Sequence, residues 1–85
     1  MIADDLTKDR GETYGSPSDN HQRTAKLWTA YLLIRPSGEL LTPEDVCMMN
    51  ILQKISRAQH GARDIDTILD IQGYAQNILE IWDEA

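Results

Sequence analysis

The sequence has one cysteine, few basic residues and no long apolar run, and each shortage excludes a class of protein. Without a second cysteine, Cys47 cannot form a disulfide within the chain, and no Cys/His cluster has the spacing of a zinc site. Eight basic against fourteen acidic residues give a net charge of -6, which argues against DNA as a partner because phosphate binding needs clustered Lys and Arg. No apolar run approaches the length of a membrane span.

The first ten residues, MIADDLTKDR, are acidic and polar. A signal peptide would need a basic start followed by an apolar segment. We therefore expect a cytoplasmic protein that has neither a membrane nor DNA as its partner. Cys47 lies in the apolar run VCMM, which is more typical of a small buried side chain than of a nucleophile.

Capping signals divide the chain into an arm and three helices. Residues 1–15 lack a sustained apolar period and carry two glycines, which predicts an extended N-terminal arm. Ser16-Pro17 and Thr42-Pro43 each combine an N-cap side chain with a proline at the first helical position. Apolar residues at helical spacing then predict helices over 16–35, 42–60 and 64–84. No strand-like alternation is present, so the predicted fold is all-α, with the last two helices forming an antiparallel hairpin.

A chain of 85 residues forms a single domain, over 1–85, with a thin core. The last predicted helix carries an apolar seam and further apolar residues outside it, so we expect it to be the central helix. The seam residues are Ile68, Ile71, Ala75, Ile78 and Trp82. These apolar faces exceed what three short helices can cover, which predicts a homodimer that completes a larger bundle.

Two polar stripes at helical spacing are the main functional signal. They consist of Asn50, Lys54 and Arg57 on the second predicted helix and Asp66, Asp70 and Asn77 on the third. An antiparallel hairpin would place Lys54 near Asp70 and Arg57 near Asp66. As structural ion pairs, these contacts would set the register of the hairpin while adding little stability.

The functional interpretation of the same stripes is a small charged site. Asp66 and Asp70 are one turn apart and could offer two oxygen ligands to Mg²⁺. Lys54 and Arg57 would then meet the phosphates of a nucleotide or another phosphorylated small molecule. The remaining candidate ligand-binding residues are Asn50, Tyr14 and Tyr74. The alternative is a noncatalytic interaction module that binds another protein through its apolar helix face, with the four charges serving only as internal salt bridges.

Gly73 lies in the middle of the third predicted helix, where glycine costs about 1 kcal/mol relative to alanine. A glycine there needs a reason. Close helix–helix packing is the first explanation, and the approach of a flat ligand is the second.

Three segments, RGETYGSPSDNHQR, DVCMMNILQKISR and DTILDIQGYA, resemble a family of short proteins of unknown function encoded by tailed phages and prophages. The resemblance covers most of the chain and implies a phage or prophage origin, with action in the host cytoplasm. For the alternative interaction module, it implies that the partner is a host or phage protein. It brings no established activity. The matching positions are Arg10, Gly11, Tyr14, Gly15, Asn20, Trp28, Asp45, Lys54, Arg57, Asp66, Asp70, Gly73 and Tyr74.

A fainter likeness concerns the all-α nucleoside triphosphate pyrophosphohydrolases, the MazG-like group, in which acidic residues on neighbouring helices hold Mg²⁺ against a triphosphate. Asp66 and Asp70 are similar to the later acidic pair of that group. Lys54 and Arg57 stand where its EExxE run would be sought, which departs from the pattern expected for hydrolysis. The sequence therefore leaves open whether the protein is an enzyme, and a residual pyrophosphohydrolase is a third possibility.

Overall fold

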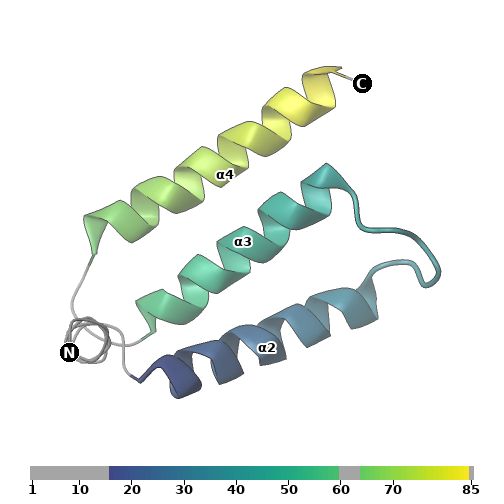
Figure 1. Cartoon of the computed structure of the whole chain (residues 1–85). Coiled ribbons are helices and arrows are strands. Elements are labelled where there is room, and N and C mark those ends of the chain that lie inside the picture. Colours follow the sequence, from purple (N-terminus) through teal and green to yellow (C-terminus); the bar gives the residue numbers. More distant parts are fainter. Residues whose placement is uncertain (1–15, 60–63, 85) are drawn as a thin grey trace, which may run out of the picture.

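The computed structural model describes residues 16–59 and 64–84, and this part of the chain is entirely helical apart from its connections (Figure 1). The helices are α2 (Pro17–Ile34), α3 (Pro43–Ala58) and α4 (Ile65–Glu84). The predicted all-α fold is therefore confirmed. The predicted arm over 1–15 lies outside the described residues.

The helices begin where the capping signals predicted. Ser16 Oγ accepts a hydrogen bond from the backbone N–H of Asp19 at 3.1 Å, and Pro17 follows as the first residue of α2. Thr42 and Asp45 form a capping box at the start of α3, in which each side chain accepts from the other residue's backbone N–H. These contacts satisfy N–H groups that have no partner inside the helix.

Asp64 sets the start of α4. Its carboxylate accepts from the backbone N–H of Asp66 at 3.1 Å and from the Thr67 hydroxyl at 2.8 Å. Asp64 therefore serves as the N-cap of α4.

The three helices form a layer in which α3 lies between α2 and α4 (Figure 1). The expectation that the last helix would be central is therefore wrong. The reason is that α3 has a contact stripe on each side. Asp45 and Ser56 hydrogen-bond to α2, whereas Lys54 and Glu44 contact α4.

Polar side chains join α2 to α3. Trp28 donates its indole N–H to the backbone carbonyl of Met49 at 2.7 Å, and the Ser56 hydroxyl donates to the carbonyl of Asn20 at 3.1 Å. Ser56 is fully buried, with no exposed area. Buried polar groups need such partners, so these bonds fix how the two helices lie along each other.

The seam of α4 shares Ile71 and Ile78 with the predicted one, and its other three positions each lie one residue earlier. The positions that lie against α3 are the least exposed of the helix, namely Thr67, Ile71, Tyr74, Ile78 and Ile81. Of the predicted seam, Ile68 and Trp82 remain 52% and 58% exposed. Thr67 can occupy the seam because its hydroxyl is satisfied by Asp64, which removes the cost of burying it.

The core is thin, as the length predicted. Among the described residues, only Cys47 and Ile78 are buried hydrophobic side chains. Burial of Cys47 confirms that it packs as a small apolar residue. Large aliphatic side chains elsewhere stay exposed, including Ile34 at 82% and Leu40 at 88%. The layer alone therefore leaves much of its apolar surface in water.

Candidate functional site

The two predicted polar stripes meet along the α3–α4 contact. Lys54 Nζ lies 3.0 Å from Asp70 Oδ2, which confirms the predicted pairing of these two residues. The lysine side chain is 13% exposed, but the aspartate side chain is 51% exposed. Lysine is thus largely covered by the helices, while half of the carboxylate remains open to solvent.

The second predicted pair, the described residues Arg57 and Asp66, does not form an ion pair in the structure. The ion pairs Lys54–Asp70 and Arg35–Asp45 connect described residues, and neither includes Arg57 or Asp66. Arg57 is half-buried and makes polar contacts of its own. Asp66 is exposed in the first turn of α4, one turn before Asp70.

A shallow recess of about 240 Å³ lies on α4 next to the ion pair. The described residues that line it are Leu69, Asp70, Gly73, Tyr74 and Asn77. Asp70 therefore belongs both to the ion pair and to the recess. Asn77, the last residue of the acidic stripe, contributes an amide to the same surface.

Gly73 opens this recess. A Cβ atom built at Gly73 has no described atom within 4 Å, so the glycine does not serve close packing between the described helices. The first explanation from sequence, helix–helix packing, is not supported. Because glycine has no side chain, the surface between Asp70 and Tyr74 stays open at this position.

Of the two remaining predicted site residues, the structure describes Asn50 but not Tyr14. Asn50 is half-buried and lies one turn before Lys54 on α3, so it shares the polar stripe. Tyr14 lies outside the described residues.

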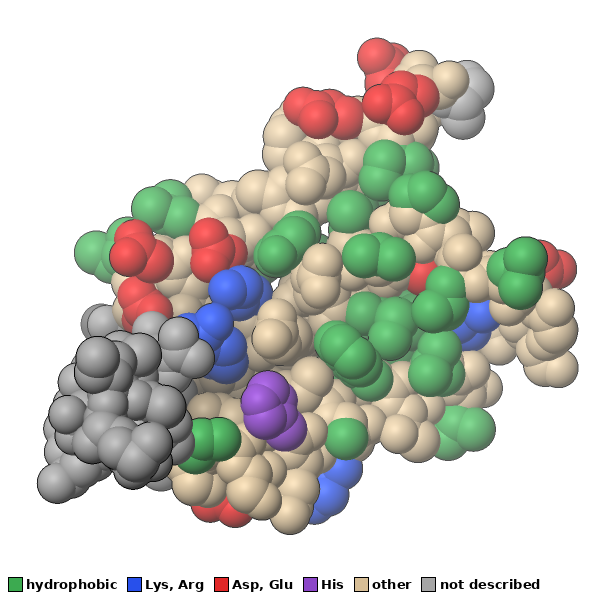
Figure 2. Space-filling view, viewed as in Figure 1, with side chains coloured by type: hydrophobic (Ala, Val, Ile, Leu, Met, Phe, Trp, Pro, Cys, Tyr) green, Lys and Arg blue, Asp and Glu red, His purple; other side chains and the backbone are tan. Residues whose placement is uncertain are grey.

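Figure 2 looks onto the side of the layer that carries the Lys54–Asp70 pair. It shows Lys and Arg side chains between α3 and α4, close to Asp and Glu side chains at the start of α4.

The carboxylates of this site are few. Within the described ranges, no group of three or more His, Cys, Asp or Glu side chains could hold a metal ion. Asp66 and Asp70 could supply only two carboxylate groups to a metal ion. That number suits Mg²⁺ bound mainly by water and substrate phosphate, which is the usual arrangement in nucleotide sites, and it does not suit an all-protein metal cage.

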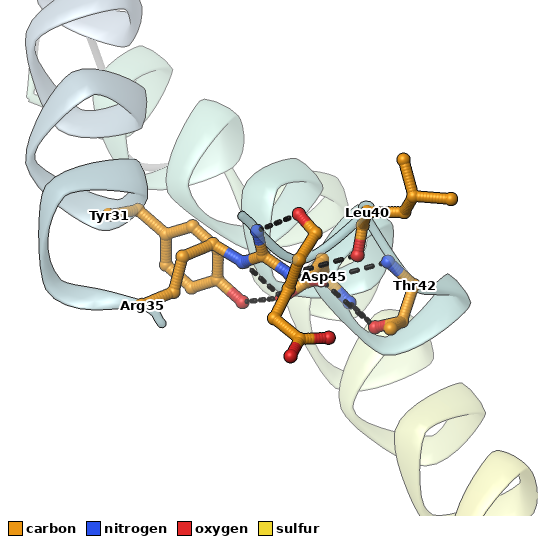
Figure 3. Close-up of polar contacts among 6 residues, drawn as sticks. Tyr31, Arg35, Leu40, Thr42 and Asp45 are labelled. Carbon is orange, nitrogen blue, oxygen red and sulfur yellow. Dashed lines mark hydrogen bonds and ion pairs between the residues drawn. The ribbon is translucent and has the colours of Figure 1, made fainter. Parts of the chain in front are cut away.

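A second polar cluster, which the sequence did not predict as a unit, lies at the other end of α3 (Figure 3). Asp45 accepts hydrogen bonds from the Tyr31 hydroxyl at 2.6 Å and from Arg35 Nη2 at 2.8 Å. The backbone N–H and hydroxyl of Thr42 add two more, at 2.8 and 3.0 Å. Arg35 also donates to the carbonyls of Glu39 and Leu40. These contacts hold the end of α2 and the connecting segment against the start of α3.

The cluster shifts the pKa of both of its acids. Burial, reinforced by the hydrogen bond to the Asp45 carboxylate, raises the pKa of Tyr31 to about 12. The hydrogen bond from Tyr31, followed by those from Thr42 and Arg35, holds the pKa of Asp45 well below its usual range. Asp45 is only 7% exposed and its oxygens are saturated with donors. It is therefore a structural group with no capacity left for a ligand.

A sequence signal for this cluster exists. Tyr31 and Arg35 are four residues apart and so share a face of α2, and Asp45 is the acidic residue three positions after the Thr42 N-cap. The connection between the helices is short enough to bring them together. Asp45 does not belong to the Lys54–Asp70 site, because it lies nine residues before Lys54, about 13 Å along the helix. It also points to α2, away from α4.

Comparison with known proteins places the chain in a family. Residues 2–81 match the model of a family described as a domain of unknown function (DUF6378). The chain belongs to this family. The predicted resemblance to phage proteins of unknown function is confirmed, whereas these comparisons give no support to the fainter likeness to the MazG-like group.

Two relatives of this DUF6378 chain come from phages. The Gene 55 protein of Mycobacterium phage L5 is 46% identical over 66 residues, which cover 78% of this chain and 40% of the relative. The Gene 55 protein of Mycobacterium phage D29 is 30% identical over 76 residues, which cover 89% of this chain and 47% of the relative. The matches thus span less than half the length of either relative. No solved structure gives a significant match. None of the described helices is both long enough and apolar enough to cross a lipid bilayer.

Proposed function

We propose that this phage-type protein binds a phosphorylated small molecule, with a nucleotide as the first candidate, at the exposed edge of the Lys54–Asp70 pair. The observation that carries the proposal is the position of Asp70. Its carboxylate is held by Lys54 on one side and borders the recess formed by Gly73 and Tyr74 on the other. A ligand in that recess would contact a fixed, half-open carboxylate.

The roles of the residues follow from their exposure. Asp66 and Asp70, one turn apart and both exposed, would share a Mg²⁺ ion that carries the phosphate groups. The exposed rim of Tyr74 and the missing side chain at Gly73 offer a flat surface for an aromatic base. Lys54 would then act mainly as the countercharge that orients Asp70, because it is already paired and only 13% exposed.

This assignment differs from the earlier expectation in one respect. Lys54 was predicted to meet phosphate directly, but that contact would require its ion pair with Asp70 to open. A metal-bridged phosphate avoids this cost, since the metal adds positive charge next to Asp70. Catalysis is not included in the proposal, because the described residues contain no group of three or more His, Cys, Asp or Glu side chains that could hold a metal ion.

The alternative proposal is a protein-interaction module with no small-molecule site. The exposed aliphatic side chains favour it, since large apolar surface left in water marks contact regions. The two proposals make different predictions for nucleotides. Only the first requires the folded protein to be stabilised by one.

A thermal unfolding experiment tests the proposal. The chain is heated with MgCl₂ alone, with nucleoside mono-, di- and triphosphates alone, and with both together. A ligand at ten times its Kd stabilises the folded state by about 1.4 kcal/mol, which raises the Tm of a domain this small by about 6–11 °C. We expect the largest shift with Mg²⁺ and nucleotide together.

Matched variants show whether the shift comes from this site. Asp66→Asn removes one proposed ligand and should abolish the added effect of Mg²⁺. Asp83→Asn makes the same change at an exposed position of α4 near its other end and should leave the shift intact. If no nucleotide shifts Tm at millimolar concentration, or if both variants respond like the parent chain, the proposal is wrong and the interaction module takes its place.

A further inference from the structure

One side of α4 carries a second seam that no described residue covers. It lies one residue further along than the stripe packed on α3, which rotates it by about 100° around the helix. Its members repeat at steps of four and three, as in a coiled coil, and all are exposed. They are Ile68, Gln72, Ala75, Leu79 and Trp82.

The neighbouring helix has a matching apolar stripe. The stripe of α3 that contacts α2 includes Asp45 and Ser56, and the one that contacts α4 includes Lys54. The rest of α3 forms two arcs that face neither α2 nor α4. One carries Asn50, Gln53 and Arg57 together with Val46, and the other is apolar and carries Met48, Leu52 and Ile55.

Two interhelical contacts show that the apolar stripes lie on the same side of the layer. Trp82, from the second seam of α4, hydrogen-bonds to Glu44, which is one turn before Met48 in the apolar stripe of α3. On the polar side, Asp70 pairs with Lys54, which is next to Asn50 and Arg57 in the polar stripe. The layer therefore has the charged site on one side. On the other side it has a surface that we name the apolar face, formed by Met48, Leu52, Ile55, Ile68, Ala75, Leu79 and Trp82.

The apolar face is large and partly open. Ile55, Ile68, Leu79 and Trp82 are 37%, 52%, 55% and 58% exposed. Contiguous exposed apolar surface marks a contact region. Cys47 and Ile78 are the only buried hydrophobic side chains among the described residues, so the layer has little core of its own, and association is a common way for a small domain to complete one.

We propose that the apolar face is covered by the same face of a second copy of this chain. None of its seven residues is charged, although 26% of the chain is. With a net charge of -6, two copies repel each other, and this face lets them approach without placing like charges together. Packing the α3–α4 pair of one copy on that of the other forms a four-helix core with two-fold symmetry.

The charged site stays outside this interface. Lys54 and Asp70 lie on the opposite side of the layer, so the dimer presents two sites that face away from each other. Dimer formation and ligand binding can therefore fail separately in experiments. A monomer that binds nucleotide would contradict only the dimer, and a dimer that binds none would contradict only the proposed function.

The test is a mass measurement by light scattering over a range of micromolar concentrations. We expect twice the 9.6 kDa mass of the chain. The double variant Ile68→Gln, Leu79→Gln should give the monomer mass. Its far-ultraviolet circular dichroism should remain helical, because both side chains are already half-exposed in the single chain. Leu32→Gln is the control, since Leu32 is similarly exposed, at 44%, but lies on α2, outside the apolar face.

The outcomes separate clearly. A monomeric parent chain overturns the proposal, as does a dimer that Leu32→Gln dissociates and the double variant does not. If the double variant loses its helical signal, Ala75→Gln is measured in its place, because that position is exposed and glutamine keeps helix propensity high. A helical Ala75→Gln variant that remains dimeric would also overturn the proposal.

Discussion

Lys54 and Asp70 form an ion pair across the α3–α4 contact at 3.0 Å in which the lysine is almost covered and the aspartate is half-open. This unequal burial gives the pair two roles. The lysine contributes to the packing of the helices through its long stem, while the carboxylate stays available to a further partner. A fully buried pair would be structural only, and a fully exposed pair would not hold its position.

The coupling between these two residues should be small. A pair with one half-exposed partner is screened by water, so a double-mutant cycle on Lys54→Met and Asp70→Asn should give less than about 1 kcal/mol of interaction energy. Chemical denaturation of the four proteins measures it. A coupling of several kcal/mol would show that Asp70 is committed to Lys54 and is not available to a ligand.

Gly73→Ala should stabilise the protein. A Cβ at this position meets no described atom, and alanine is favoured over glycine inside a helix by about 1 kcal/mol. Urea denaturation provides the measurement, with Gln76→Ala on the same helix as a control in which the propensity gain is small. A destabilised Gly73→Ala variant would reveal a close contact at the recess and would contradict the open surface described above.

Tyr31→Phe should destabilise the protein by about 1–2 kcal/mol, the range for a hydrogen bond to a charged group that keeps other donors. The hydroxyl of Tyr31 is the closest donor to Asp45, at 2.6 Å, and Arg35 and Thr42 remain after its removal. Tyr74→Phe is the control, because no described residue hydrogen-bonds to the Tyr74 hydroxyl. Equal stability of the two variants would mean that the cluster does not secure α2 to α3.

The same cluster predicts an alkaline transition. The pKa of Tyr31 is 10.0 in the unfolded chain and about 12 in the folded one, so the folded state binds the phenolic proton more tightly. The stabilisation is complete below pH 10 and is lost as the pH rises from 10 through 12. Denaturation midpoints recorded over this range should fall, and they should fall less in Tyr31→Phe. An identical decline in both proteins would contradict the shift.

The helices were predictable because their signals are local. Ser16-Pro17, Thr42-Pro43 and Asp64 each place a cap next to an apolar period, and a cap acts through residues within one turn. The pairing of Lys54 with Asp70 could also be predicted from the sequence, since an antiparallel hairpin fixes which residues face each other. These parts of the prediction depend only on neighbours in sequence or on one turn between two helices.

The arrangement of the layer was not predictable in the same way. Choosing α4 as the central helix relied on the amount of apolar sequence, but the burial of α3 depends on the hydrogen bonds that Trp28 donates to α3 and that the Asn20 carbonyl accepts from it, which sequence alone does not reveal. Three of the five seam positions of α4 were misplaced by one residue, because Thr67 is a polar residue whose burial becomes understandable only with its hydrogen bond to Asp64. The apolar residues thereby assigned to the seam, Ile68 and Trp82, are the ones left on the apolar face.

The most direct test of the proposed site is isothermal titration of the chain with a Mg²⁺-nucleoside triphosphate, comparing Gly73→Leu with Gln76→Leu. Both changes add the same side chain to the exposed surface of α4, but only Gly73 lines the recess beside Asp70. The account predicts binding to the parent chain and to Gln76→Leu, and none to Gly73→Leu. Equal binding to the two variants, or no binding to the parent chain, would contradict a ligand site at Asp70.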